Sequence, residues 1–378
     1  MDFLAGELDR IEEAGLFREP RTLESAPAAR VLIGGREFVN FASNNYLDLA
    51  TDPRVKQAAC AAVETWGAGA TASRLLGGSH APHAALEAAL ARLKGTEAAA
   101  VFPSGYHANV GAIQALLGPE DAAFVDRLAH ASLLDGVRLS RATLRVFRHN
   151  DPEDLRAALS RSSARRRWVI TESVFSMDGD AAPLPELAAA AREAGAFLYV
   201  DEAHATGVWG PGGRGLAQGA GAADVCMGTL SKALGGLGGF VCGSRRLVSW
   251  IHNSCRSFIY STALPASCAA AALKALDIAA AEPWRREKAW ALADSLRRRL
   301  GLPSGGAGPI VCAPFGEAGS ALDAARRLQA AGVFAPAIRP PTVPAGSSRI
   351  RFSVTAGHRE EDVARAADAL RPPAHARS

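Results

Sequence analysis

At 378 residues the chain is long for a single hydrophobic core, so we expect one large domain and one smaller companion. Its 42 basic and 38 acidic residues give a formal net charge of only +4 and are spread along the chain, which argues against a nucleic-acid partner. No apolar run approaches the roughly 18 to 20 residues of a membrane span, so no membrane partner is expected.

The N-terminal residues have early acids and helical spacing, without a basic segment ahead of an apolar block. We therefore expect neither a signal peptide nor a transit peptide there, but an N-terminal helical arm over residues 1–45. The six cysteines include no C-x-x-C pair, and several lie within apolar segments. This usage is typical of reduced thiols and predicts a cytoplasmic protein.

From residue 98 onward, short apolar runs alternate with segments of helical period, which predicts an α/β fold with a seven-stranded, mostly parallel sheet flanked by helices. Too few residues separate the last two strands for a parallel crossover, so one of them is expected to be antiparallel to its neighbours or to lie elsewhere in the sheet. The predicted strands are AAAVF (98–102), AAFVD (122–126), TLRVF (143–147), RWVITESV (167–174), AFLYVD (196–201), DVCMGTL (224–230) and GGFVCG (238–243).

Residues 266–300 are Ala-rich and helical, and they lead out of the sheet. Two shorter strand candidates follow, at 309–315 and 349–356, with a helical segment at 320–332 between them. We therefore predict a large domain over residues 46–282 and a small C-terminal α+β domain over residues 283–378.

In a parallel sheet, ligands gather at the carboxyl ends of the strands. After the first strand, Ser104, Gly105 and Tyr106 open a helix in a small-residue turn that would aim N–H groups and a hydroxyl at an anion. An ordinary Ser-Gly turn is the alternative. His130 begins the helix after the second strand, where a lone histidine is more often structural.

Two further strands end in polar residues. Glu172, Ser176 and Asp178 lie near the end of the fourth strand, where turn-forming polar residues would look the same. Asp201 ends the fifth strand with His204 three residues later, which suits a ligand that has two polar atoms on one edge. A metal site that includes Glu202 is the alternative, but no second His/carboxylate pair at helical spacing supports it, and no metal is expected.

Lys232 follows the sixth strand. A phosphate-binding P-loop has glycine before its lysine and Ser or Thr after it, whereas Ser231 precedes Lys232 and Ala233 follows. The dinucleotide pattern G-x-G-x-x-G, started at Gly236, fails at Val241. Neither nucleotide motif is present.

What remains is a lysine at a strand end, flanked by hydroxyls, on the same sheet edge as Asp201 and His204. Pyridoxal 5'-phosphate needs a lysine amine for its Schiff base, an acid beside the ring nitrogen and a donor near the ring hydroxyl. It also needs a nest of N–H and OH groups for its phosphate. Each requirement has a candidate, so we predict this cofactor.

Eight segments spread over nearly the whole chain resemble the α-oxoamine synthase family of fold-type I pyridoxal-phosphate enzymes. The closing stretch AIRPPTVPAGSSRIRFSVTA resembles the branch that makes 8-amino-7-oxononanoate more than the branches that make aminolevulinate or 2-amino-3-ketobutyrate. The segments are FASNNYLDLA, GAGATASRLLGGSHAPHAALE, FPSGYHANVGAI, DRLAHASLLDG, TESVFSMDGD, VDEAHATGVWG, GTLSKALGG and IYSTALP.

The resemblance implies that Lys232 bonds to the cofactor and that Asp201 keeps the pyridinium nitrogen protonated. It implies that His204 and Ser176 hydrogen-bond near the ring hydroxyl and that His130 stacks on the ring. It also implies a homodimer with shared active sites. The remaining cofactor-binding positions that it implies are Ser104, Gly105, Tyr106, Glu172, Thr229 and, from the second subunit, Thr262.

For the substrates, the resemblance implies that Asn44 and Arg351 bind the amino-acid carboxylate, a task that suits the arginine fork. Arg18 and Thr342 match positions that contact the acyl substrate. Ser73 and His130 are the other substrate-binding positions.

The implied reaction joins L-alanine to a pimeloyl thioester, carried on coenzyme A or a carrier protein, to give 8-amino-7-oxononanoate, CO2 and free thiol in biotin biosynthesis. The Lys232 amine would remove the α-proton as general base. A related enzyme that uses glycine or serine with another acyl-CoA stays open, as does another fold-type I enzyme such as an aminotransferase. Asp48 stands where the family often has glycine, and we expect it to adopt the left-handed conformation of that turn.

Overall fold

The computed structural model describes residues 1, 3–218, 223–303 and 308–371 of the chain. It divides into two compact units. Residues 49–176 and 180–286 form the first, which we call the sheet unit. Residues 1–48, 177–179 and 287–378 form the second, which we call the terminal unit.

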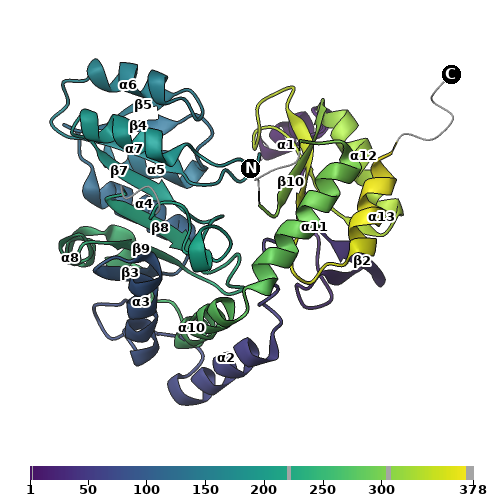
Figure 1. Ribbon diagram of the computed structural model, residues 1–378, viewed down its shortest axis with the longest axis horizontal. Helices are drawn as coiled ribbons and strands as arrows, with labels where there is room; N and C mark the ends of the chain where they lie inside the picture. The colour runs from purple at the N-terminus through teal and green to yellow at the C-terminus, as the bar shows by residue number, and fades with distance from the viewer. Residues whose placement is uncertain (2, 219–222, 304–307, 372–378) are drawn as a thin grey trace. The chain divides into compact units, whose positions relative to one another are not determined.

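The sheet unit is built on one seven-stranded sheet with the order β3-β9-β8-β7-β6-β4-β5 (Figure 1). The pairs from β8 to β5 are parallel, whereas β9 is antiparallel to both β3 and β8. The predicted seven-stranded, mostly parallel sheet is therefore confirmed, and of the two arrangements expected for the last strands the structure has the antiparallel one. The strands are β3 (Ala98–Phe102), β4 (Ala122–Asp126), β5 (Thr143–Phe147), β6 (Arg167–Glu172), β7 (Phe197–Asp201), β8 (Val225–Thr229) and β9 (Gly239–Gly243).

Helices cover the sheet, and several begin where the sequence supplies a cap. Asp52 accepts a hydrogen bond from the N–H of Arg54, and Asp151 accepts two at the start of α6, each just before a proline that suits the first helical turn. The helices of this unit are α2 (Pro53–Trp66), α3 (Ala81–Lys94), α4 (Gly105–Leu116), α5 (Ala131–Ser140), α6 (Pro152–Ser160), α7 (Leu184–Glu193), α8 (Arg245–Ser254), α9 (Arg256–Ile259) and α10 (Ala266–Ala281), with a 3-10 turn at Pro211–Gly213.

The core of the sheet unit joins one face of the sheet to the helices packed on it. Ile113 of α4 and Leu133 of α5 are fully buried there against Val125 and Ile170 of the sheet. The helical segment predicted over residues 266–300 is two helices, because α11 (Trp284–Leu300) starts just after Pro283, which has no N–H to continue α10.

The terminal unit contains two three-stranded sheets, ordered β1-β2-β11 and β10-β13-β12. Phe41, Val311, Phe352 and Val363 are among the residues of its core. Its elements include the C-terminal strands and helix that the sequence predicts. They are α1 (Phe3–Glu13), β1 (Arg30–Ile33), β2 (Arg36–Asn40), β10 (Ile310–Gly316), α12 (Ala318–Ala330), β11 (Val333–Phe334), β12 (Ala337–Ile338), β13 (Ser348–Ser353) and α13 (Glu360–Leu370).

The hairpin of β1 and β2 is an element that the sequence analysis did not predict. Its two-residue turn is Gly34-Gly35, with φ of 56° and 70°, which is the left-handed geometry that tight hairpins favour. Asp48 adopts a left-handed φ of 56°, as expected from its place in the sequence. None of the helices in the described part of the chain is both long and apolar enough to cross a membrane.

Candidate active site

Two acids lie side by side at the carboxyl edge of the sheet. Glu172 ends β6 and Asp201 ends β7, and the two are register partners on parallel strands. Both are buried, and Asp201 is in turn paired with Met227 of the next strand. Lys232 lies in the turn just beyond the end of β8, so these side chains come from adjacent strand ends.

His130 joins this group as the N-cap residue, directly before the first residue of α5. Its backbone N–H donates to Glu172 Oε1 at 2.7 Å. Burial lowers the pKa of the His130 imidazole; the charge of Asp201 opposes this and that of Lys232 adds to it. Burial raises the pKa of the Glu172 carboxyl, and the charge of Asp201 raises it further, which favours a protonated Glu172. The structure thus brings four of the predicted residues together.

The Asp201 carboxylate is held on both oxygens. Oδ1 accepts from the backbone N–H of Ala203 at 2.8 Å, and Oδ2 accepts from Asn109 Nδ2 at 2.7 Å. His204 is buried in the turn that follows β7. Ser176 lies in the loop after β6, whose two sides are bridged by Val174 and Ala181. His204 and Ser176 thus lie just beyond the carboxyl ends of β7 and β6, which is where the sequence predicts them.

The start of α4 forms a tight cradle beside β8. Ser104 caps the helix by accepting from the His107 N–H at 3.2 Å. A Cβ on Gly105 would lie 3.0 Å from Met227 Cε and 3.5 Å from Thr229 Oγ1, so the bare backbone of Gly105 faces Thr229. The helix N-terminus and this hydroxyl form an anion site that fits a phosphate.

Three hydroxyls around this cradle already have partners. Thr229 Oγ1 donates to the Gly238 carbonyl at 2.8 Å and lies 2.8 Å from the hydroxyl of Ser231. The Tyr106 hydroxyl donates to Asp135 at 2.8 Å. Tyr106 would therefore bind an anion through its backbone N–H and not through this hydroxyl. Ser231, an exposed residue beside Lys232, was not predicted as a ligand.

Ser73 and Thr262 form a separate pair. They are joined by an isolated antiparallel bridge, and the Ala263 N–H donates to the Ala72 carbonyl beside it at 3.0 Å. The Ser73 hydroxyl is buried and has no hydrogen-bond partner among the described residues, which leaves it able to bind a ligand or a second chain.

In the terminal unit, Arg351 and Asn44 are in direct contact. Both terminal nitrogens of Arg351 donate to Asn44 Oδ1 at 3.1 Å, and they also reach Ser353 and Tyr46. Burial raises the pKa of the Tyr46 phenol, although the Arg351 charge opposes this rise. Tyr46 and Ser353 are partners of Arg351 that the sequence analysis did not identify.

Arg18 and Thr342 also lie together in the terminal unit. Arg18 donates to Thr342 Oγ1 at 3.3 Å and to the Pro340 carbonyl at 3.1 Å. Arg18 lines a cavity of about 700 Å³ whose apolar wall includes Leu322 and Phe334. A cation beside an apolar wall suits a chain-like acyl substrate with a polar end.

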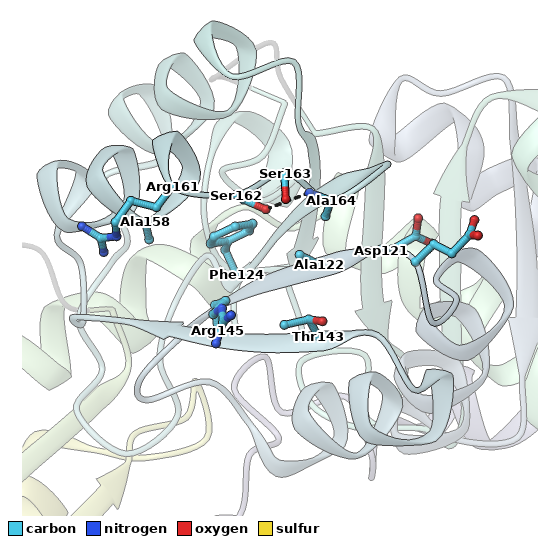
Figure 2. Close-up of a pocket in the computed structure, with 11 residues that line it drawn as sticks. Asp121, Ala122, Phe124, Thr143, Arg145, Ala158, Arg161, Ser162, Ser163 and Ala164 are labelled. Carbon is cyan, nitrogen blue, oxygen red and sulfur yellow. Dashed lines mark hydrogen bonds between the residues drawn. The ribbon is translucent and has the colours of Figure 1, made fainter.

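A second cavity, of about 490 Å³, lies in the sheet unit. Phe124, Thr143, Arg145 and Arg161 are among the residues that line it, and Figure 2 draws them as sticks. It lies where β4 and β5 begin, whereas the predicted residues follow the strand ends, and none of them lines it.

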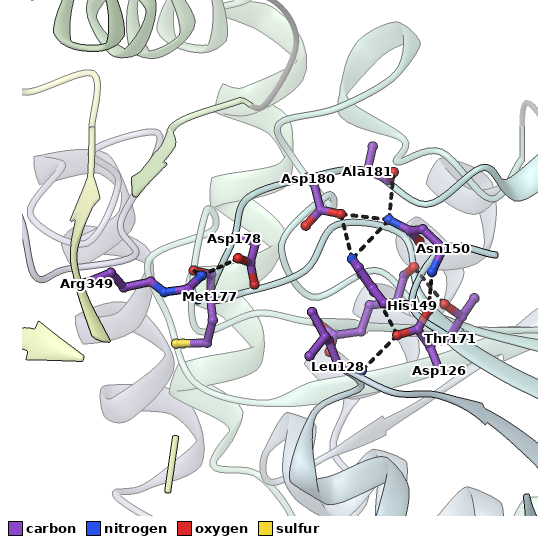
Figure 3. Close-up of polar contacts among 11 residues, drawn as sticks. Asp126, Leu128, His149, Asn150, Thr171, Met177, Asp178, Asp180, Ala181 and Arg349 are labelled. Atoms are coloured by element: carbon purple, nitrogen blue, oxygen red, sulfur yellow. Dashed lines mark hydrogen bonds and ion pairs between the residues drawn. The ribbon is translucent and has the colours of Figure 1, made fainter. Parts of the chain in front are cut away.

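A polar cluster fixes the loop that carries Ser176 (Figure 3). His149 is bonded through Nδ1 to Asp126 at 2.8 Å and through Nε2 to Asp180 at 2.9 Å. Burial alone would lower the pKa of the imidazole, but the two carboxylates raise it to about 10, so the ring is a cation that donates from both nitrogens. Within the terminal unit, Arg349 forms an ion pair with Asp178.

Asn109 is the main site residue that sequence reasoning missed. It lies in the apolar helical segment ANVGAIQALL, and it is buried. A lone amide within an apolar helix was the available signal, because a buried polar group requires a partner. Which partner it meets depends on how α4 packs against β7.

The model of the aminotransferase class I and II family matches residues 36–370. An 8-amino-7-oxononanoate synthase from Anaeromyxobacter dehalogenans is 49% identical over 365 residues, covering 95% of this chain and 92% of that protein. A protein of the same name from Geobacter sulfurreducens is 48% identical, with 97% and 96% covered. A solved serine palmitoyltransferase from S. paucimobilis with bound PLP and myriocin is 32% identical, with a TM-score of 0.91, covering 98% of this chain and 96% of that chain.

Proposed function

Because this chain belongs to the aminotransferase class I and II family, we propose that it is a pyridoxal-phosphate acyltransferase of biotin biosynthesis. The reaction condenses L-alanine with a pimeloyl thioester and releases 8-amino-7-oxononanoate, CO2 and free thiol. The observation that carries this proposal is the meeting of Lys232, Asp201, Glu172 and His130 at one sheet edge in a chain 49% identical to a protein named 8-amino-7-oxononanoate synthase.

The residues at this edge fit the cofactor. The start of α4 with Thr229 would hold its phosphate, Asp201 its ring nitrogen, and His204 and Ser176 its ring hydroxyl. The space left by the missing Cβ of Gly105 supports the phosphate position. When bound, pyridoxal phosphate acts as an electron sink for a carbanion at the amino-acid Cα.

The protein side chains would then manage charge and protons. The buried Asp201 carboxylate, held by two N–H donors, stays available to a protonated ring nitrogen. Lys232 Nζ is the base that would take the proton from alanine Cα. His130 would lie over the ring, where its neutral imidazole adds no second positive charge beside Lys232.

We assign the amino-acid carboxylate to Arg351 with Asn44, because a guanidinium fork matches two carboxylate oxygens. Arg18 and Thr342 would contact the pimeloyl group at the cavity that Arg18 lines. The acyl donor is the thioester of coenzyme A or of a carrier protein.

A homodimer and a cytoplasmic location are part of the proposal. Leu75, Leu76 and Tyr260 are exposed beside the Ser73 and Thr262 pair, which favours a partner subunit that covers them and shares Thr262. All six cysteines are free thiols, which suits a reducing compartment.

A second candidate is the condensation of serine or glycine with another acyl-CoA. The fold similarity to serine palmitoyltransferase, with a TM-score of 0.91, favours it. Substrate trials therefore decide between the two.

The test supplies pimeloyl-CoA, pimeloyl-carrier protein and longer acyl-CoA, each with alanine, glycine or serine, and follows the release of free thiol. We expect a yellow protein that releases thiol fastest with alanine and a pimeloyl thioester. Lys232→Ala should release none and should lose the borohydride-reducible bond to the cofactor. A colourless wild type, or release only with serine and long acyl-CoA, would reject the first candidate.

A further inference from the structure

The Asn109 amide occupies a junction between three buried groups. Its Nδ2 donates to Asp201 Oδ2 at 2.7 Å and to Ser132 Oγ at 2.9 Å, and its Oδ1 accepts from the Tyr199 hydroxyl at 2.9 Å. Asn109, Ser132 and Tyr199 are each at most 2% exposed. Solvent therefore cannot replace any of these hydrogen bonds.

The hydrogen bonds determine which way the amide points. Burial raises the pKa of the Tyr199 phenol well above its ordinary value, so its hydroxyl keeps the proton that it donates to Oδ1. Both N–H groups of the amide are then committed, one to Asp201 and one to Ser132. A reversed amide would place its oxygen against the Asp201 carboxylate, where two acceptors meet without a proton.

A chain of hydrogen bonds connects this amide through Ser132 to His130. Ser132 Oγ accepts from Asn109, so its own hydrogen is available to His130 Nδ1 at 2.8 Å. The Ser132 N–H donates to the same nitrogen at 3.2 Å. Nδ1 is thus an acceptor, and the neutral ring carries its proton on Nε2.

We propose that Asn109 is a positioning residue that orients the Asp201 carboxylate and ties it through Ser132 to His130. The role rests on the proposed function, because these two side chains meet a cofactor ring only if pyridoxal phosphate binds here. Asn109 itself lies behind them and touches no reacting atom.

The decisive variant is Asn109→Asp, which keeps the shape but sets a second carboxylate against Asp201. Two carboxylates at this distance share one proton, so the single negative charge is divided between them and Asp201 no longer presents a full charge of its own. We expect the holoenzyme to bind the cofactor about tenfold more weakly or worse, and the pH midpoint of its visible absorption band to move by about one unit.

Tyr199→Phe is the matched control, because it removes a hydrogen bond from the same amide but leaves the donor to Asp201 in place. It should lower stability yet keep the absorption midpoint of the wild type. Equal midpoints in all three proteins would overturn the proposal, since a purely structural asparagine predicts that result.

Combining Asn109→Asp with Asp201→Asn restores one amide and one carboxylate across the same contact. In the cofactor-free protein we expect this double variant to recover stability that Asn109→Asp loses, but not to recover cofactor binding. Additive losses of stability would overturn the Asn109 to Asp201 coupling. This measurement needs no cofactor, so it stays informative if the wild type binds no pyridoxal phosphate and the proposed function fails.

Discussion

At the scale of single residues, His149 shows how one side chain holds a loop. Its ring is 24% exposed and lies between Asp126, whose side chain is fully buried, and Asp180, which is 38% exposed. A cation between two carboxylates forms two charge-assisted hydrogen bonds, which are stronger than neutral ones. The loop that carries Ser176 is therefore anchored by electrostatics as well as by packing.

This anchor depends on pH in a defined direction. The pKa of His149 rises from 6.5 to about 10 on folding, so the folded protein binds the proton more tightly than the unfolded chain does. Its contribution to stability is complete below about pH 6.5, declines as the pH rises, and is lost above about pH 10.

His149→Gln should lower the free energy of unfolding by about 2 kcal/mol near pH 6.5, after allowance for the exposure of Asp180. The gap between variant and wild type should close as the pH approaches 10. Urea unfolding of both proteins from pH 6 to 10 measures this difference in the free energy of unfolding. Arg148→Gln removes a neighbouring cation that is 67% exposed and should change stability little at any pH in this range. A gap that does not vary with pH would contradict the assigned charge.

At the scale of elements, the approach of β9 to the start of α4 shapes the phosphate cradle. A Cβ on Gly239, the first residue of β9, would lie 2.6 Å from both Gly105 Cα and the Ser104 carbonyl oxygen. Such contacts are far shorter than van der Waals distances, so any larger residue must push the helix N-terminus away from Thr229. Under the proposed function, the glycine-rich segment from β8 into β9 would thus serve cofactor binding as well as chain reversal.

Gly239→Ala should destabilise the protein by roughly 1 to 3 kcal/mol, as overpacking does, and should weaken binding of pyridoxal phosphate. Gly236→Ala is the control in the same link, because its Cβ would make only ordinary contacts at 3.5 Å or more. Urea unfolding and absorbance titration with the cofactor measure both effects. If the two variants behave alike, the cradle does not depend on this close approach.

The elements that the sequence predicts correctly are those whose pattern is local. The strands AAFVD and TLRVF have the predicted bounds, because a short apolar run between two helical segments is too short for a buried helix and forms a buried strand. The hairpin at Gly34 and Gly35, which is not among the predicted elements, also has a local signal, because a Gly-Gly turn between alternating residues favours a hairpin. The break at Pro283 has one too, since proline cannot donate the hydrogen bond that continues a helix.

At the scale of the whole molecule, the exposed apolar side chains around residues 73–76 and 260–262 point to a partner subunit. Leu76 is 85% exposed, Tyr260 73% and Leu75 53%. Monomeric proteins rarely leave such side chains clustered in water. In the proposed homodimer Thr262 of this cluster binds the cofactor of the partner subunit, so loss of that dimer should also impair the cofactor site.

Leu76→Asp should therefore reduce the mass in solution from about twice 39.3 kDa to near 39.3 kDa and should weaken cofactor binding. Sedimentation equilibrium measures the first effect and absorbance titration the second. Leu139→Asp alters a leucine on α5 that is 54% exposed and should remain dimeric. A variant at Leu76 that stays dimeric and keeps its cofactor would reject this interface.

Local patterns and loop lengths in the sequence are enough to predict the order of the strands along the chain and the polar residues that end β6, β7 and β8. They also exclude a parallel crossover between the last two strands. The contacts of Asn109 with Asp201, of His149 with Asp126 and Asp180, and of Tyr46 with Arg351 are visible only in the folded chain. Each of these contacts joins residues that are 23 or more positions apart. Such pairs depend on how elements pack in three dimensions, which no periodicity along the chain encodes.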